Sequence, residues 1–218
     1  MTDVRSVAGP WTSRDLDILE TLTLRIRFMN LDQIASIWWS SGHFQLIGVR
    51  RRLRELCKAG LLSRYSITAH PILELSEAVC TWEPGMPAPN HSSVAYRLQS
   101  RWTEASVAIH VFAASPMTAN LFASYSGKLP PPLMWTHDLH MAEVYRQYRL
   151  KRPEEAVLWQ GEDAFKKAEH GTKNPDAFLI ATDGSISRVI DFGGKYDAER
   201  VLDFHFYCAD RELEYELW

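Results

Sequence analysis

The chain has 218 residues, of which 46% are hydrophobic and 23% charged, a composition typical of a globular protein with one large domain or two small ones. Its formal net charge of −3 hides a split: residues 1–66 carry ten Lys/Arg against six Asp/Glu, and residues 151–218 carry nine against fifteen. The basic N-terminal part indicates a polyanionic partner. Three distant cysteines, no apolar run of about 18 residues and no basic leader argue against a zinc module, a disulfide scaffold, a membrane span and secretion. The sequence therefore predicts a cytoplasmic protein.

Two helix starts are marked within the first 40 residues. Thr12 precedes Asp15 by three positions, which is the spacing of a capping box. Asn30 and Gln33 repeat that spacing and offer a second start. Apolar residues at helical spacing follow each start, so we expect two short amphipathic helices.

A third helix is predicted over residues 45–59, where Gly60 ends it. Its apolar residues recur at i, i+4, i+7 and i+8, namely Val49, Leu53, Leu56 and Cys57. Most of its cations fall on the other side, and residues 61–67 then have the pattern of a strand. We expect the second strand of the pair at residues 78–82.

Three short helices followed by a strand pair predict a winged helix-turn-helix, in which the third helix enters the major groove of double-stranded DNA. The residues predicted to contact DNA are Arg50, Arg51, Arg52, Arg54, Lys58 and Arg64. The alternative is an amphipathic helix whose basic face is merely solvated.

The domain boundary is predicted at the proline-rich segment 84–90, because three prolines there remove amide donors and fix the backbone. This assigns residues 1–83 to the winged helix, residues 84–90 to a linker and residues 91–218 to a second domain. Helices are predicted at 91–101, at 136–150 with Thr136 as cap, and at 197–208.

A tight hairpin is the clearest feature of the second domain. The apolar runs 177–181 and 187–191 flank an Asp183-Gly184 step, the strongest short hairpin signal. Residues 156–159 and 213–218 offer two further strands. With the helices 136–150 and 197–208, the last of which is expected to pack through Val201, Leu202 and Phe206, the order is α-β-β-β-α-β. The predicted fold class is α+β or α/β.

Two acids lie at one end of this hairpin, Asp176 before the first strand and Asp191 at the end of the second, and Lys195 follows. Carboxylates are ligands that Mg²⁺ prefers, and a bound divalent cation can activate water and neutralise a phosphodiester. The alternative is a hairpin with solvated acids at its mouth, which is common at strand ends.

Three features together resemble the PD-(D/E)xK nuclease superfamily. They are the order of the elements, the dipeptide Pro175-Asp176 before Ala177, and Asp191 at the end of the next strand. More narrowly, a winged helix ahead of the motifs HDL, WQGED, PDA and DFGGKY resembles the replication-relaxation proteins of plasmids and other mobile elements. The resemblance implies a restriction-endonuclease-like domain that holds Mg²⁺ or Mn²⁺ through Asp176, Asp191 and Glu162. It also implies a catalytic or phosphate contact for His137.

The lysine of that family lies two residues after the second acid, and here Gly193 occupies the position. Lys195 would lie about 13 Å from Asp191 along a straight strand, unless Gly193 and Gly194 bend the chain back. The helical spacing of His137, His140 and Glu143 also permits a transition-metal site, although core-edge and surface roles are commoner for such residues.

Two functions follow from these patterns. One is a Mg²⁺-dependent endonuclease or nickase directed to its site by the winged helix. The other is a non-catalytic initiator of replication or transfer, or a repressor, that uses the nuclease-like fold as a scaffold. DNA binding is common to both, and a homodimer or an assembly with other mobile-element proteins stays open.

Overall fold

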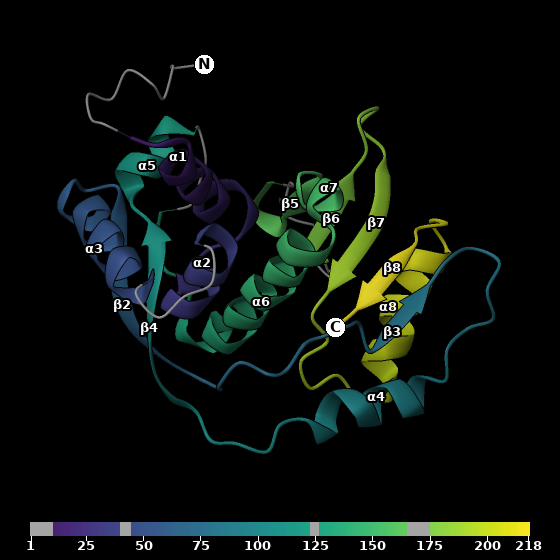
Figure 1. The fold of residues 1–218 in the computed structure, drawn as a ribbon. Helices are drawn as coiled ribbons and strands as arrows, with labels where there is room; N and C mark the ends of the chain where they lie inside the picture. Colours follow the sequence, from purple (N-terminus) through teal and green to yellow (C-terminus); the bar gives the residue numbers. More distant parts are fainter. Residues whose placement is uncertain (1–10, 40–44, 123–126, 165–174) are drawn as a thin grey trace. The chain divides into compact units, whose positions relative to one another are not determined.

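The computed structural model describes residues 11–39, 45–122, 127–164 and 175–218, and its chain is a mixed α+β fold with two sheets (Figure 1). Two compact units can be separated. Unit 1 comprises Met1–His70 and Ser106–Arg146, and unit 2 comprises Pro71–Ala105 and Gln147–Trp218. Each unit is therefore built from two separate stretches of sequence.

Unit 1 combines helices with a three-stranded sheet of order β1-β4-β2. Its elements are α1 (Ser13–Glu20), the π-helix η2 (Thr21–Arg25), β1 (Met29–Asn30), α2 (Leu31–Trp38), α3 (Gln45–Lys58), β2 (Leu62–Ala69), β4 (Val107–Ala114), α5 (Pro116–Leu121), the 3-10 turn η3 (Pro132–Met134) and the first part of α6 (Trp135–Lys151).

Both predicted capping boxes are confirmed. Thr12 accepts from the backbone N–H of Asp15 while the Asp15 carboxylate accepts from the N–H of Thr12, which satisfies donors that the first turn leaves open. Asn30 and Gln33 do the same at the start of α2. Helix α3 is followed by Gly60 in the left-handed conformation, with φ +74°.

The strand pair of unit 1 differs from the prediction. Strand β2 pairs along its whole length with β4, from Leu62 opposite Ala114 to Ala69 opposite Val107, and β1 pairs with the other edge of β4. Residues 78–82 were predicted to be that second strand, which is wrong. The strand there, β3 (Cys80–Trp82), pairs with β8 (Tyr215–Leu217) in the other sheet.

Unit 2 holds a five-stranded sheet of order β3-β8-β7-β6-β5, antiparallel except for the parallel pair β7–β8. Its remaining elements are α4 (His91–Ser100), α7 (Pro153–Ala156), β5 (Trp159–Gly161), the 3-10 turn η4 (Glu162–Ala164), β6 (Ala177–Ile180), β7 (Ile186–Asp191) and α8 (Ala198–Ala209). The sequence of α6, β5, β6, β7, α8 and β8 follows the predicted order of elements.

The predicted hairpin is confirmed. Strands β6 and β7 are antiparallel, with Ala177 opposite Ile190, and the turn between them places Gly184 at φ +86°. Asp183 accepts from the backbone N–H of Ser185 at 2.9 Å and so fixes the turn with its own side chain.

Helices α4 and α8 pack on one face of this sheet, and the core between them is apolar. Trp82 stacks on Tyr215 with ring centroids 5.7 Å apart, which explains why β3 belongs to this sheet. On α8, Val201 is buried as predicted, but Phe206 is 53% exposed and Phe204 packs inward in its place. Leu202 is half-buried, and the prediction that Phe206 packs on the sheet is wrong.

The proline-rich segment is not a boundary between the units. Residues 84–90 join β3 to α4, and both of these elements belong to unit 2. The chain passes between the units near residues 70, 105 and 146 instead. Thr136 is also not a helix cap: α6 begins one residue earlier, and the Thr136 hydroxyl accepts from the backbone N–H of His70 at 3.0 Å.

Among the described residues, no helix has both the length and the apolar character that crossing a bilayer requires.

Candidate functional site

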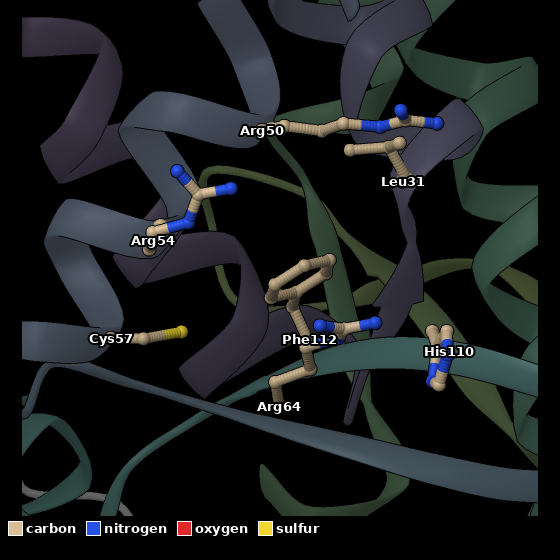
Figure 2. Close-up of a pocket in the computed structure, with 7 residues that line it drawn as sticks. All are labelled: Leu31, Arg50, Arg54, Cys57, Arg64, His110 and Phe112. Atoms are coloured by element: carbon tan, nitrogen blue, oxygen red, sulfur yellow. The ribbon is translucent and has the colours of Figure 1, made fainter. Parts of the chain in front are cut away.

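A basic cleft lies between α3 and the strand pair of unit 1 (Figure 2). Its volume is about 400 Å³, and it is lined by Leu31, Arg50, Arg54, Cys57, Arg64, His110 and Phe112. Three of these residues, all arginines, were predicted to contact DNA.

Helical and strand geometry explain why these side chains meet. Arg50, Arg54 and Cys57 are spaced by four and three positions on α3, so they project from the same side of that helix. Arg64 on β2 is directly opposite Phe112 on β4, and His110 lies two residues away on the same sheet face. Figure 2 shows the two sets facing the same space.

The cleft carries positive charge. Arg50, Arg54 and Arg64 are exposed, and none of them has a hydrogen bond or an ion pair to a described residue. No Asp or Glu is among the described residues that line the cleft. Burial raises the pKa of the Cys57 thiol, and the charge of Arg64 acts against that shift. Cys57 is therefore a neutral, apolar part of the wall at neutral pH.

The other predicted DNA contacts on α3 fall into two groups. Arg51 and Lys58 are exposed, and Arg51 has only a loose partner, Glu55, at 4.0 Å. Arg52 differs, because its guanidinium donates to both carboxylate oxygens of the buried Asp15, at 2.9 and 2.6 Å. It also donates to Glu55 at 2.8 Å. Arg52 therefore ties α3 to α1, and its prediction as a DNA contact is not supported by its geometry.

Three acids line up across neighbouring strands of unit 2. Gly161 is opposite Ala177, and Ala177 is opposite Ile190. One residue further along, the same registers place Glu162, Asp176 and Asp191 in a row. The backbone N–H of Glu162 donates to the carbonyl of Asp176 at 3.0 Å, which agrees with that row. Cβ atoms of directly opposite residues are about 5 Å apart in such sheets.

The acids are more buried than solvated acids at a hairpin mouth would be. Asp191 is fully buried and Asp176 is 9% exposed. One oxygen of Asp176 accepts from the backbone N–H of Phe192 at 2.8 Å. In the described residues, no three His, Cys, Asp or Glu side chains are grouped so as to hold a metal ion. The row therefore has the donor chemistry of a divalent-cation site without the converged geometry.

Position 193 is crowded where the nuclease pattern has a lysine. A Cβ atom at Gly193 would lie 2.8 Å from a side-chain methyl group of Leu98 on α4 and 3.0 Å from one of Leu217 on β8. A lysine there would therefore require these two core side chains to shift.

The chain does bend after Asp191, but the bend leads Lys195 elsewhere. Gly194 is left-handed at φ +53°, and the N–H of Tyr196 donates to the carbonyl of Gly193 at 2.8 Å. Lys195 is exposed, with its ammonium 5.5 Å from the centroid of the Trp102 ring. This is a cation–π contact, and within the described residues Lys195 has no ion pair with the acids.

The polar residues of α6 have structural partners in unit 1. His137 contacts Asp138 through Nδ1 at 3.1 Å, and His140 contacts the carbonyl of Thr136 at 2.6 Å. Glu143 accepts from Arg146 at 2.7 Å. These contacts agree with structural roles at the edge of the core, the alternative to a transition-metal site. A catalytic role for His137 stays a prediction.

Three residues of interest were missed from the sequence. His110 and Phe112 lie on β4, whose pairing with β2 across 37 intervening residues leaves no local signal. The third is Arg101, which donates to the carbonyl of Trp218 at 2.9 Å and lies over Phe192. Burial lowers the pKa of Arg101 to about 10.

Neither family models, nor curated proteins, nor solved structures give a match to this chain.

Proposed function

We propose that the protein binds double-stranded DNA through unit 1, with α3 as the recognition helix and β2–β4 as the wing. The element order α1-β1-α2-α3-β2-β4 is that of a winged helix-turn-helix once the distant strand β4 takes the place of the predicted one. The observation that carries the proposal is the cleft in which Arg50, Arg54 and Arg64 gather with no acid among them.

The exposed face of α3 supports this function. Arg50, Arg51, Arg54 and Lys58 lie at i, i+1, i+4 and i+8, and all four are exposed. Ile47, one turn before Arg51, is 69% exposed. An exposed apolar side chain on a cationic helix suits the methyl group of thymine in the major groove. Arg50 and Arg54 have no ion pair to a described residue, so they can bind phosphates or guanine edges without losing one.

The test is the salt dependence of binding to a random-sequence duplex. Each phosphate contact contributes about 0.9 to the slope of log K against log salt concentration. Replacing Arg50, Arg54 and Arg64 together with alanine is expected to reduce that slope by about two to three, and the affinity near 0.1 M salt by roughly one hundredfold. Fluorescence anisotropy over a range of salt concentrations measures both quantities.

The matched control replaces three exposed arginines of unit 2, Arg97, Arg200 and Arg211, with alanine. It removes the same net charge, so a general electrostatic effect would reduce binding in both variants alike. Equal losses in the two triple variants, or an unchanged slope in the first, would refute α3 and the wing as the interface.

The row of acids in unit 2 supports a second candidate, a metal-dependent endonuclease or nickase. Glu162, Asp176 and Asp191 would hold Mg²⁺ or Mn²⁺, which when bound would supply a Lewis acid to a phosphodiester. Gly193 weighs against catalysis, because it stands where the nuclease pattern has its lysine, and a side chain there would have to displace Leu98. A non-catalytic initiator or repressor with a nuclease-like scaffold is therefore the alternative.

Metal titration distinguishes the metal-dependent nuclease from the non-catalytic scaffold. If the acids hold a cation, millimolar Mn²⁺ is expected to raise the melting temperature of the wild type, by roughly 5–10 °C at one hundred times Kd. Asp176→Asn should abolish the rise and leave duplex binding intact, because the cleft belongs to unit 1. Nicking of supercoiled plasmid by the wild type and not by the variant would establish the enzyme. If Mn²⁺ does not stabilise the wild type and the wild type does not nick the plasmid, the non-catalytic scaffold is the hypothesis that remains.

A further inference from the structure

We propose that the basic cleft of unit 1 is also a binding site for a small aromatic phosphomonoester of mononucleotide type, which competes with DNA. The inference goes beyond DNA binding but uses the same cleft. It starts from the volume of about 400 Å³, which lies within the range of roughly 300–1,000 Å³ typical of small-molecule sites. Contacts to the backbone phosphates of a duplex need cationic groups at the surface, and they do not need a hollow.

The lining divides into an apolar part and a cationic part. Leu31, Cys57 and Phe112 are apolar, and Phe112 is only 8% exposed, so its ring is held in place by packing. Figure 2 shows this ring between the guanidinium groups of Arg54 and Arg64. A ligand that combines a flat ring with an anionic group satisfies both parts of the lining at once.

The cationic groups come from two different elements. Arg50 and Arg54 project from α3, and Arg64 and His110 from the strand pair. A phosphomonoester carries close to two negative charges at neutral pH and accepts several hydrogen bonds, which guanidinium groups match in geometry. Guanidinium planes also stack on aromatic rings. The described lining holds no acid, so a phosphomonoester would not meet there the repulsion that it meets elsewhere on an acidic protein.

Competition follows from the shared arginines. A ligand that engages Arg50, Arg54 and Arg64 leaves fewer cations for the DNA backbone, so each partner should weaken the binding of the other by the same factor. A nucleotide in this cleft would therefore act as an inhibitory effector of DNA binding.

The test uses three probes, AMP, adenosine and inorganic phosphate, with binding measured by calorimetry and by thermal unfolding of the full chain. We expect AMP to bind at least ten times more tightly than either of the other two, since only AMP addresses both parts of the lining. The apparent Kd for a fluorescent duplex should rise in proportion to AMP concentration. Equal binding of AMP and phosphate, or of AMP and adenosine, would overturn the inference.

Two variants keep the test independent of folding defects. Arg64→Ala removes an exposed cation and should weaken AMP at least tenfold. Leu31→Trp fills the cleft from the half-buried start of α2 without changing charge, and it should weaken AMP to a similar degree. Undiminished AMP binding in both would refute the site. Duplex binding is measured on the same samples without AMP: a protein that binds the duplex but not AMP refutes only this inference, and the reverse result refutes only the DNA-binding function.

Discussion

Replacing Glu216 with alanine is expected to lower the free energy of unfolding of unit 2 by about 3–5 kcal/mol, the usual cost of breaking a buried ion pair. Glu216 lies on β8 and is 5% exposed. Its carboxylate accepts from Arg152 at 2.6 and 3.1 Å, from the Tyr148 hydroxyl at 2.8 Å and from the Trp218 indole at 2.9 Å. Alanine removes the acceptor that these donors share.

The conservative variant separates charge from shape. Glu216→Gln keeps an acceptor for Tyr148 and Trp218 but removes the nearer counter-charge of Arg152, which retains Glu155 at 3.6 Å, so a smaller loss of roughly 1–3 kcal/mol is expected. The matched control is Glu214→Gln, two residues earlier, where the side chain is 36% exposed and accepts from Arg188. Its cost should be below about 1 kcal/mol. Denaturant unfolding followed by tryptophan fluorescence measures all three.

The pH dependence has a definite sign. Burial acts to raise the pKa of Glu216, but the hydrogen bonds and charge of Arg152, with help from Tyr148 and Arg188, outweigh it and hold the pKa below its ordinary value of 4.5. A lowered folded-state pKa stabilises the protein above the unfolded value, and that stability is lost as pH falls below about 4.5. The stability difference between the wild type and Glu216→Gln should therefore shrink in acid. A difference that is constant from pH 7 to pH 3 would contradict the role of charge.

Local chemistry made the helix starts, the end of α3 and the β6–β7 hairpin predictable. Thr12, Asn30, Gly60 and Gly184 each act through their own backbone or within a few residues, so their signals are complete in a short window of sequence. The register that places Asp176 opposite Asp191 does not follow from the turn alone, because the pairing shifts by one residue between Leu179 and Ile180.

Long-range pairing was not predictable in the same way. Strand β3 has the pattern of a half-buried strand, and nothing in residues 78–82 distinguishes β2 from β8 as its partner. The choice depends on the stacking of Trp82 on Tyr215, more than 130 residues away. Burial around Gly193 is likewise decided by Leu98 on a distant helix. The sequence predicted the arginines that α3 contributes to the cleft. It did not predict His110 and Phe112, because their position in the cleft depends on the pairing of β4 with β2.

The arginines of α3 illustrate a further limit, because Arg51 and Arg52 are neighbours with different roles. Arg52→Ala is expected to destabilise unit 1 by about 3–5 kcal/mol, since it leaves the carboxylate of Asp15 without its cation inside the protein. Asp15 is fully buried, and the hydrogen bonds of Asp15 raise the pKa of Arg52 further above its ordinary value. Arg51→Ala, the matched control, should change stability by less than about 0.5 kcal/mol, because its side chain is 78% exposed.

DNA binding should respond in the opposite order. Arg51→Ala is expected to reduce the salt slope by about one, the contribution of a single phosphate contact. Arg52→Ala, measured below its unfolding temperature, should leave the slope unchanged, because its guanidinium is held by Asp15 and Glu55. Denaturant unfolding and anisotropy on the same two variants give the full comparison. A reduced slope in Arg52→Ala with unchanged stability would show that the arginine leaves Asp15 to bind DNA, and the division between structural and binding arginines would then be wrong.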